Sequence, residues 1–399
     1  MEDPSQKIAA LSSIDASSFS AEPARVKALK EARELVQRLE TPWDKLTSVL
    51  WVAPARHGLL LTGIEIGLFD ALEKAPSGAS LDELLELLPV KVDKVLLRRI
   101  LNVLTALGDV KVVDEKYAPT TFTTSLATNP GVRAAIIRAE DTTMVSMHLP
   151  VYLKKIGYKE PADAKTGNHY DTFGMDMFTR LREFPEKGKQ FNQFMTAIST
   201  IYRIPPWWEL YPFEKLLDGY DPSKGPLIVD VGGGVGTLLE KFRDALPEPH
   251  KTSTSLVFQD LPSVITQAKT RTLPPNLHGM SHDFLKPQPV HGARAYFMRA
   301  VLHDWPDVDC HTILTHLHKV MIPGYSKLLV DDRIVASKNV DLMTATSDII
   351  MMVNLDAKER TEEDWRGLFE GAGFKLIKIW YGTRCVLEAE VVCVLLGGN

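Results

Sequence analysis

The stretch LIVDVGGGVGTLL, residues Leu227–Leu239, is the most informative part of the chain. Its first five residues are apolar except for Asp230, which is the pattern of a buried β-strand, and its last three residues open a helix. Three glycines at alternate positions lie between them, Gly232, Gly234 and Gly236. Glycine lets a backbone turn sharply and approach a ligand, because no Cβ intervenes. The stretch therefore predicts the first unit of a doubly wound, Rossmann-like α/β sheet.

The glycine spacing separates two classes of ligand. A dinucleotide fingerprint requires G-x-G-x-x-G/A, but counting from Gly232 the last position is Thr237, and the third glycine comes one residue earlier. The pattern is instead D-x-G-x-G-x-G, in which Asp230 stands two residues before the first glycine. A glycine-rich turn in an ordinary α/β domain remains the alternative. Strand, loop and helix together favour nucleotide binding.

Composition excludes several classes of protein. The 399 residues suffice for two domains, and 45% hydrophobic with 24% charged residues is ordinary for a globular protein. A net charge of −5 argues against a general nucleic-acid binder. Three cysteines, Cys310, Cys385 and Cys393, are too few and too scattered for a disulfide framework or a zinc site. We see no signal peptide and no run of 18 apolar residues, so we expect a cytoplasmic protein with no membrane partner and no bound metal.

The N-terminal part predicts a helical domain with a β-wing. Residues Glu22–Glu40 follow the period of an amphipathic helix, and Gly58–Leu72 is expected to be one helix, apolar nearly all round and buried in a core or between subunits. A helix over Val92–Leu107 precedes two short strands, Val110–Val113 and Lys116–Ala118. This winged-helix pattern would by itself suggest DNA binding. Residues 57–120, however, carry 7 Lys/Arg against 10 Asp/Glu, so packing and dimer formation are favoured.

Further strands extend the sheet. After the glycine loop the predicted strands are Ser255–Gln259, His278–Phe284, Ala295–Arg299, Lys327–Asp331, Phe374–Tyr381 and Leu387–Leu395, the last two forming an antiparallel pair. An acid at the end of the second strand, here Asp260, is where such folds hold a ribose diol. Asp283 and Phe284 are placed to meet an adenine by hydrogen bonding and stacking. The predicted fold is a seven-stranded Rossmann-like sheet.

The catalytic candidate is His303, in RAVLHDWPD at the end of the fourth strand. Reacting groups gather at the carboxyl ends of parallel strands, and a neutral imidazole can accept the proton of a hydroxyl group. A carboxylate on the far ring nitrogen would fix the tautomer, and two acids follow later strands or loops, Asp332 and Glu359. The alternative is that Asp304 caps a helix and that His303 is merely its neighbour.

Together these motifs resemble a known family. LIVDVGGGVGTLL, FQDLPSVI, HDFL, RAVLHDWPD and NLDAKERTEEDW, in this order, are similar to those of the plant and fungal small-molecule O-methyltransferases, of caffeate and flavonoid type, with a dimerising winged-helix domain. The resemblance covers residues from about Ala55 onward. It implies S-adenosylmethionine as cofactor, a homodimer and a phenolic or related aromatic substrate. The segment YLKKIGYKEP is of fungal type, which implies a polyketide or alkaloid substrate from secondary metabolism.

The resemblance assigns roles and regions. Cofactor binding falls on Asp230, Gly232, Gly234, Asp260, Leu261, Asp283, Phe284, Arg299 and Ser199; catalysis on His303, Asp332 and Glu359; and substrate contact on Met195, Phe191, Asn354 and His148. The expected regions are a mobile arm over residues 1–20, a winged-helix-like dimerisation domain over 21–130, a helical linker and substrate-pocket region over 131–215, and the cofactor domain over 216–399.

Two departures from the family pattern leave alternatives open. The first flanking acid is commonly Glu but here is Asp332, one methylene shorter, so Glu359 is expected to do most of the orienting. Thr142–His148 differs from the plant pattern. We therefore weigh a methyltransferase against a non-methylating relative that binds S-adenosylmethionine and catalyses dehydration or pericyclic ring formation. In that relative His148 and Arg299 would polarise a carbonyl.

Overall fold

The computed structural model describes residues 4–9, 11, 13–161, 163, 165–201, 204–382 and 384–392. Within helix α12 the side chains of residues 199–201 also lie outside the description. The chain divides into two compact units, Met1–Thr124 and Ser125–Asn399. The finer division expected above stays a prediction. In the described residues no helix is both long enough and apolar enough to cross a membrane.

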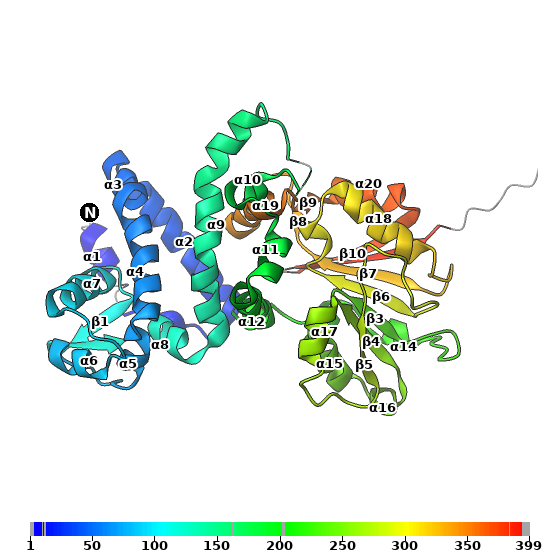
Figure 1. The fold of residues 1–399 in the computed structure, drawn as a ribbon, viewed down its shortest axis with the longest axis horizontal. Helices are drawn as coiled ribbons and strands as arrows, with labels where there is room; N and C mark the ends of the chain where they lie inside the picture. The colour runs from blue at the N-terminus through cyan, green and yellow to red at the C-terminus, as the bar shows by residue number, and fades with distance from the viewer. Residues whose placement is uncertain are drawn as a thin grey trace, which may run out of the picture. The chain divides into compact units, whose positions relative to one another are not determined.

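The first unit is mainly helical (Figure 1). Its elements are α1 (Pro4–Ala9), η1 (Ala16–Ser18), α2 (Glu22–Leu39), α3 (Pro42–Thr47), η2 (Ser48–Val52), α4 (Ala53–Glu65), α5 (Leu68–Glu73), α6 (Leu81–Leu87), α7 (Lys94–Ala106), β1 (Val110–Val113) and β2 (Lys116–Pro119); α8 (Thr121–Thr128) runs across the boundary. The predicted wing is present, because β1 and β2 pair antiparallel. Asp114 and Glu115 join them with φ of 48° and 62°, positive values that most residues avoid but that two-residue hairpin turns require.

One helix prediction was wrong. Gly58–Leu72 is not continuous but forms the end of α4 and most of α5. Gly67 separates them with φ of +73°, a left-handed conformation that ends a helix and that glycine adopts without strain. Only the second half of the apolar run, Leu68 to Leu72, is fully buried apart from Asp70. Apolar composition alone could not reveal the break.

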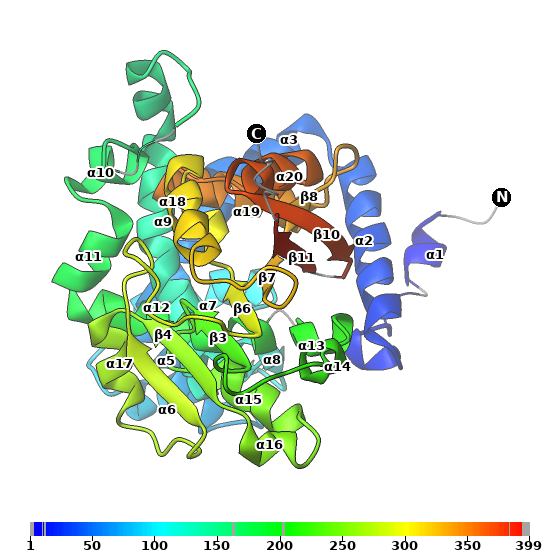
Figure 2. The same ribbon diagram turned by 90° about the vertical axis from the view of Figure 1, so that its right-hand side faces the viewer.

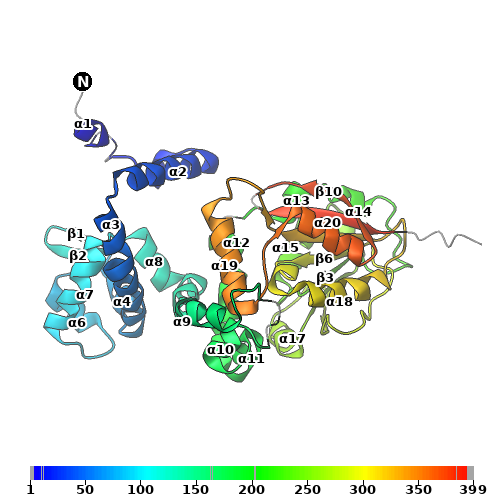
Figure 3. The same cartoon turned by 90° about the horizontal axis from the view of Figure 1, so that it is seen from above.

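The second unit begins with a group of helices that flanks its sheet. They are α9 (Pro130–Lys155), α10 (Asn168–Phe173), α11 (Met177–Glu183) and α12 (Pro185–Ile201), and α19 (Leu342–Leu355) packs against α9 and α10 from far along the chain. Figures 1 and 3 show these helices side by side. Pro185 is the first residue of α12, where proline is tolerated, whereas in the interior of a helix it is not.

The seven-stranded sheet is confirmed. Its strands are β3 (Ile228–Val231), β4 (Leu256–Asp260), β5 (Leu277–Ser281), β6 (Ala295–Arg299), β7 (Lys327–Asp332), β10 (Phe374–Trp380) and β11 (Cys385–Val391), in the order β10-β11-β7-β6-β3-β4-β5. The order from β4 to β10 can be followed in Figure 2. Strand β11 runs antiparallel to both neighbours, and the other pairs are parallel.

Helices cover both faces of this sheet, so its central strands are apolar except near their carboxyl ends. One face packs against α18 (Asp307–His318) and α20 (Glu362–Gly371). The other packs against α13 (Trp207–Leu210), α14 (Glu214–Leu217), α15 (Thr237–Ala245) and α17 (Pro262–Ala268), with the short α16 (His250–Ser253) following α15. Trp207 is buried there against Phe242 and Phe297. The charged ends of the strands are left to form a site.

A second, two-stranded parallel sheet was not predicted. Strands β8 (Ile334–Val335) and β9 (Arg360–Thr361) pair with each other; β8 begins two residues after Asp332, and β9 begins directly after Glu359. Two-residue strands carry no periodic signal in a sequence. Their pairing, Ile334 with Arg360, fixes the two acidic positions beside each other.

Candidate active site

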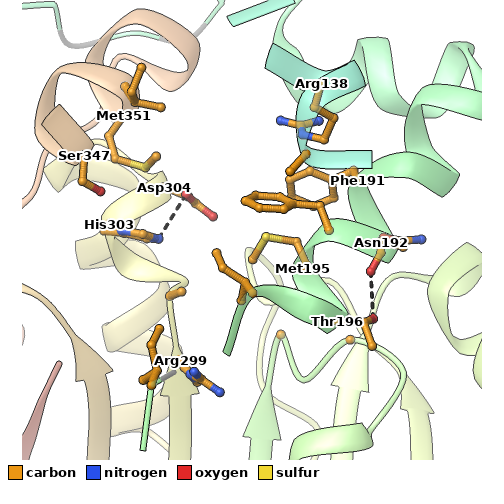
Figure 4. A pocket seen from close by; sticks show the side chains of 18 of the residues that line it. Arg138, Phe191, Asn192, Met195, Thr196, Arg299, His303, Asp304, Ser347 and Met351 are labelled. Atoms are coloured by element: carbon orange, nitrogen blue, oxygen red, sulfur yellow. Dashed lines mark hydrogen bonds and ion pairs between the residues drawn. The ribbon is translucent and has the colours of Figure 1, made fainter. Parts of the chain in front are cut away.

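A cavity of about 530 Å³ opens at the carboxyl ends of β3 and β6. All its lining residues belong to the second unit. The glycine loop with Asp230, Arg299 and Ala300 forms one part of the lining, and side chains from α9, α12 and α19, many of them apolar, form another. Figure 4 shows the walls facing each other, with Arg138, Phe191 and Met195 on one and His303, Ser347 and Met351 on the other. A volume of this size fits a small-molecule ligand.

The glycine loop has the conformation that its sequence predicts. Gly232, Gly234 and Gly236 have φ of +77°, +60° and +80°. A Cβ on Gly232 would lie 2.8 Å from Val301 Cγ2, whereas one on Gly234 would meet nothing within 4 Å. The loop therefore combines a left-handed backbone with an open face toward the cavity, as close approach of a ligand requires.

The chemistry of the loop fits a cationic cofactor. Asp230 is buried at the end of β3 and lines the cavity. Burial raises the pKa of its carboxyl to about 7, with Asp260 and Asp331 adding to the increase and Arg299 opposing it. A bound ammonium or sulfonium group would relieve this unfavourable burial of negative charge. S-adenosylmethionine carries both groups.

Of the other predicted cofactor residues, Arg299 lines the cavity, whereas the cavity lining does not include Asp260, Leu261, Asp283 or Phe284. Asp260, at the end of β4, accepts a hydrogen bond from the Gly234 amide at 2.9 Å. Phe284 packs edge-to-face on Trp305, with ring centroids 5.6 Å apart, and Asp283 accepts from the Leu285 amide. Arg299 lines the cavity and pairs with Asp331. Leu261 is exposed, and the side chain of Ser199 lies outside the described part of the structure.

A strained turn brings His303 to the cavity. Ala300 directly follows β6 with φ of 51°, a left-handed value that is unfavourable for alanine and typical of functional sites. The 3₁₀ turn η3 (Leu302–Asp304) then places His303 among the lining residues. Helix α18 begins only at Asp307, with Pro306 at its N-cap. Asp304 therefore does not cap this helix, which removes the structural alternative for the His303–Asp304 pair.

Three carboxylates surround the His303 ring. Nδ1 lies 3.1 Å from Glu359 Oε1 and 3.6 Å from Asp332 Oδ1, and Nε2 lies 3.4 Å from Asp304 Oδ1. Burial by itself lowers the pKa of His303, but these acids outweigh it and raise the pKa to about 9. When Nδ1–H donates to Glu359, Nε2 is left to exchange a proton with a hydroxyl in the cavity.

The two flanking acids are held differently. Glu359 Oε1 accepts hydrogen bonds from Ser347 Oγ at 2.6 Å and from His303, and the pKa of Glu359 is lowered despite its burial. Asp332 stands beyond hydrogen-bonding distance of His303 and accepts instead from Arg384 at 3.2 Å. The direct orienting contact is thus made by Glu359, as its longer side chain suggested.

Arg384 and Ser347 were missed by sequence reasoning. Arg384 is buried and directly precedes β11. Its guanidinium donates hydrogen bonds to the side chain and the backbone carbonyl of Asp331 and to the side chain of Asp332. Ser347 lies on α19, 12 residues before Glu359. Neither belongs to a motif. A signal for Arg384 did exist, because two adjacent acids at the end of a buried strand require a cation.

His303, Asp332 and Glu359 also offer three metal-type ligand atoms within 4.8 Å of one another. Their surroundings favour an imidazolium rather than a metal ion. Arg384 already supplies a positive charge to Asp332, and Glu359 already accepts a hydroxyl hydrogen bond. A divalent cation at this place would lie beside a buried guanidinium, which is electrostatically unfavourable.

The predicted substrate residues separate into two groups. Phe191 and Met195 on α12 and Asn354 on α19 line the cavity. His148 does not; its Nε2 pairs with Asp171 at 2.9 Å on the neighbouring α10. Asp171 also pairs with Lys155, which balances the negative charge of Asp171 within this cluster.

Comparison with known proteins identifies the family to which the chain belongs. The model of the O-methyltransferase domain matches residues 159–375, which include the glycine loop, His303 and Glu359. The chain belongs to the S-adenosylmethionine-dependent O-methyltransferase family. O-methyltransferase mfmE of the fungus Annulohypoxylon moriforme is 35% identical over 398 residues, covering 97% of this chain and 96% of the relative.

Solved structures agree with this assignment. LepI in complex with SAM has a TM-score of 0.88 and 28% identity and covers 97% of this chain and 100% of its own. A structure described as a pericyclic reaction enzyme has a TM-score of 0.89 at the same identity and coverage. OxaC in complex with sinefungin and meleagrin has a TM-score of 0.82 and 25% identity, covering 94% of each chain. The cofactor of this O-methyltransferase-family protein is S-adenosylmethionine.

Proposed function

We propose that the protein transfers the methyl group of S-adenosylmethionine to a hydroxyl of a small aromatic or polyketide-type secondary metabolite, with His303 as general base. The observation that carries the proposal is His303 itself: it lines the same cavity as the glycine loop and hydrogen-bonds Glu359 at 3.1 Å. Relatives named O-methyltransferases come from fungi, which supports a secondary metabolite as substrate.

The chemistry needs alignment and a proton acceptor. The new bond joins the substrate oxygen to the methyl carbon while the carbon–sulfur bond breaks, and the hydroxyl proton passes to His303 Nε2. A phenol has a pKa of about 10, so a base whose pKa is about 9 accepts its proton with little energetic penalty. Glu359 holds the ring and stabilises the imidazolium that forms. Phe191, Met195 and Met351 supply an apolar surface for a flat ring.

A second candidate function rests on one observation, the likeness to a pericyclic reaction enzyme. In such a reaction the cofactor would stay bound and the cavity would polarise a carbonyl. Arg299, which lines the cavity, remains available for this role, whereas His148 stands outside the lining. The carboxylate-bound His303 favours methyl transfer, because a pericyclic reaction requires no proton acceptor.

The deciding experiment follows methyl-labelled S-adenosylmethionine through a panel of phenolic and polyketide substrates. We expect wild type to give a labelled product and one equivalent of S-adenosylhomocysteine, and His303→Ala to lose transfer by about 10²-fold or more while it still binds cofactor. Equal turnover by His303→Ala would remove the base assignment. Consumption of a polyene substrate with the cofactor unconsumed would establish the pericyclic function instead.

We further propose that the protein is a homodimer in the cytoplasm. Helix α2 contains no buried residue, yet it presents the apolar side chains Val26, Leu29, Val36 and Leu39. The next segment, α3 and η2, exposes Trp43, Leu46, Val49, Leu50 and Trp51. We call these nine side chains the N-terminal apolar surface. Large apolar side chains exposed in such number along consecutive elements point to a protein interface, and a second copy would bury them as the family resemblance implies.

A further inference from the structure

Arg138 is a cation in the cavity that the proposed reaction does not use. It lies on α9 among the lining residues, and its guanidinium carbon stands 4.6 Å from the centre of the Phe191 ring. Figure 4 shows it above Phe191, on the wall opposite His303. A guanidinium stacked on an aromatic face is held flat, with its edge of N–H donors free to point into the cavity.

Within the described residues no carboxylate lies within 4.0 Å of Arg138, and no hydrogen bond ties its guanidinium. The nearby Asp141 is already paired with two other cations, Arg180 at 3.1 Å and Lys187 at 2.9 Å. Asp304, on the opposite wall, is 3.4 Å from the His303 ring. The wall formed by α9 and α12 therefore carries an excess of positive charge.

Leaving a half-buried guanidinium without a partner is unfavourable. Burial lowers the pKa of Arg138 to about 10, against the attraction of Asp141 and Asp304, so the group still carries its charge at neutral pH. The five N–H donors of Arg138 cannot be satisfied by Phe191 and Met195, the apolar side chains on the same wall of the cavity. Such a group is retained where a ligand supplies the missing acceptor.

We propose that Arg138 binds an anionic oxygen of the substrate, a carboxylate or an enolate, while His303 faces the hydroxyl that is methylated. This inference rests on the proposed function and narrows the substrate class to acidic aromatic or polyketide compounds. The planar fork of Arg138 matches a pair of acidic oxygens, and Phe191 beneath it matches the adjoining ring.

The test measures binding rather than turnover, on the full chain saturated with S-adenosylhomocysteine. Calorimetry compares 2,4-dihydroxybenzoic acid with its methyl ester, and an acidic cyclic 1,3-diketone with its enol methyl ether. The first pair probes a carboxylate and the second an enolate. We expect wild type to bind the acidic member of one pair about ten-fold more tightly, the value of one well-formed charged hydrogen bond.

Variants then assign the preference to one residue. Arg138→Gln should reduce the preference for the acidic ligand to less than about two-fold, with the affinity for the ester retained. Arg138→Met keeps the aliphatic stem over Phe191 and should reduce the preference to the same extent. Arg138→Lys should show a preference between those of wild type and the neutral variants, because the positive charge remains but the planar, forked arrangement of donors is lost. Lys189→Gln is the matched control: Lys189 lies on α12 and pairs with Glu186 away from the cavity lining.

Three results would overturn the inference: no acid preference in wild type, an unchanged preference in both Arg138→Gln and Arg138→Met, or loss of the preference in Arg333→Gln, another cation of the cavity. Failure of the proposed function looks different. Acid binding would then depend on Arg138 although no substrate acquires the methyl label. Conversely, labelled neutral phenols with no effect of Arg138 would refute this inference alone.

Discussion

The protonation state of His303 governs the chemistry at the scale of single residues. Its pKa is raised to about 9, so the ring is mainly an imidazolium at pH 7 until a substrate or cofactor changes the balance. A proton acceptor must be neutral, and at pH values below the pKa the neutral fraction of the ring increases about ten-fold for each unit by which the pH rises. The sulfonium of the cofactor, a cation in the same cavity, lowers this pKa and thereby favours the reactive form.

Activity should therefore rise with pH. With saturating cofactor we expect kcat/KM for a neutral phenol to increase with a slope near one from about pH 6 and to level off at or below about pH 9. Steady-state kinetics in constant-ionic-strength buffers measures the profile. A rate independent of pH over this interval would contradict the assignment.

Two variants serve as controls for that profile. Both Glu359→Gln and Asp332→Asn remove negative charge and should move the midpoint to lower pH, because each acid favours the imidazolium. Glu359→Gln should also lower the plateau, since the ring loses the carboxylate that holds it at 3.1 Å. Asp332→Asn leaves that contact in place and should keep a plateau closer to wild type.

At the scale of elements, the glycine loop combines two separate requirements. Gly232 and Gly234 both have positive φ, but only the first is also crowded. A Cβ on Gly232 would meet Val301, which packs in the core beside the loop, whereas Gly234 faces open space. Backbone strain and steric crowding can thus be measured independently.

Alanine substitution should separate the two effects. Gly234→Ala should destabilise the protein by about 1–2 kcal/mol from its left-handed backbone, and Gly232→Ala by roughly 1–3 kcal/mol more from the added clash. Both should weaken cofactor binding. Chemical denaturation and calorimetry with S-adenosylhomocysteine check the pair; equal stability losses would show that Val301 moves aside.

The elements also show what a single sequence can reveal. Strands β3, β6 and β7 were predictable because buried parallel strands are mainly apolar runs, and each of these carries a charged residue at or next to its carboxyl end. The β8–β9 pair was not, since two-residue strands have no period. The break at Gly67 was missed for a different reason: the apolar pattern continues across it. Of the site, motif residues such as His303 and Gly232 were predictable. Arg138 and Ser347 belong to no motif, and the side chains that they contact lie on other elements. Arg384 was indicated only indirectly, by the two adjacent acids at the end of β7 that require a cation.

For the whole molecule, the main open prediction concerns association. The N-terminal apolar surface includes Val49 and Trp51, which are 70% and 58% exposed in the single chain. Burying such side chains contributes about 25 cal/mol per Å², which favours a dimer. Light scattering at micromolar concentration should give twice the mass of one chain, and the double variant Val49→Glu/Trp51→Glu should give the mass of a monomer.

Val308→Glu is the matched control, because Val308 is an equally exposed valine, at 74%, that lies in the second unit on α18. It should leave the mass unchanged. A monomeric wild type, or a double variant that remains dimeric, would show that this surface serves another purpose.

Helix α19 has a consequence for attempts to alter selectivity. The same helix carries Ile350, Met351 and Asn354, which shape the cavity, and Ser347, which donates to Glu359. A substitution made to enlarge the cavity can therefore shift the helix and change how firmly Glu359 holds His303. The width of the cavity and the basicity of His303 are therefore linked through one helix. For an engineered variant that admits a bulkier acceptor, the pH optimum should be determined again before its turnover is compared with that of wild type.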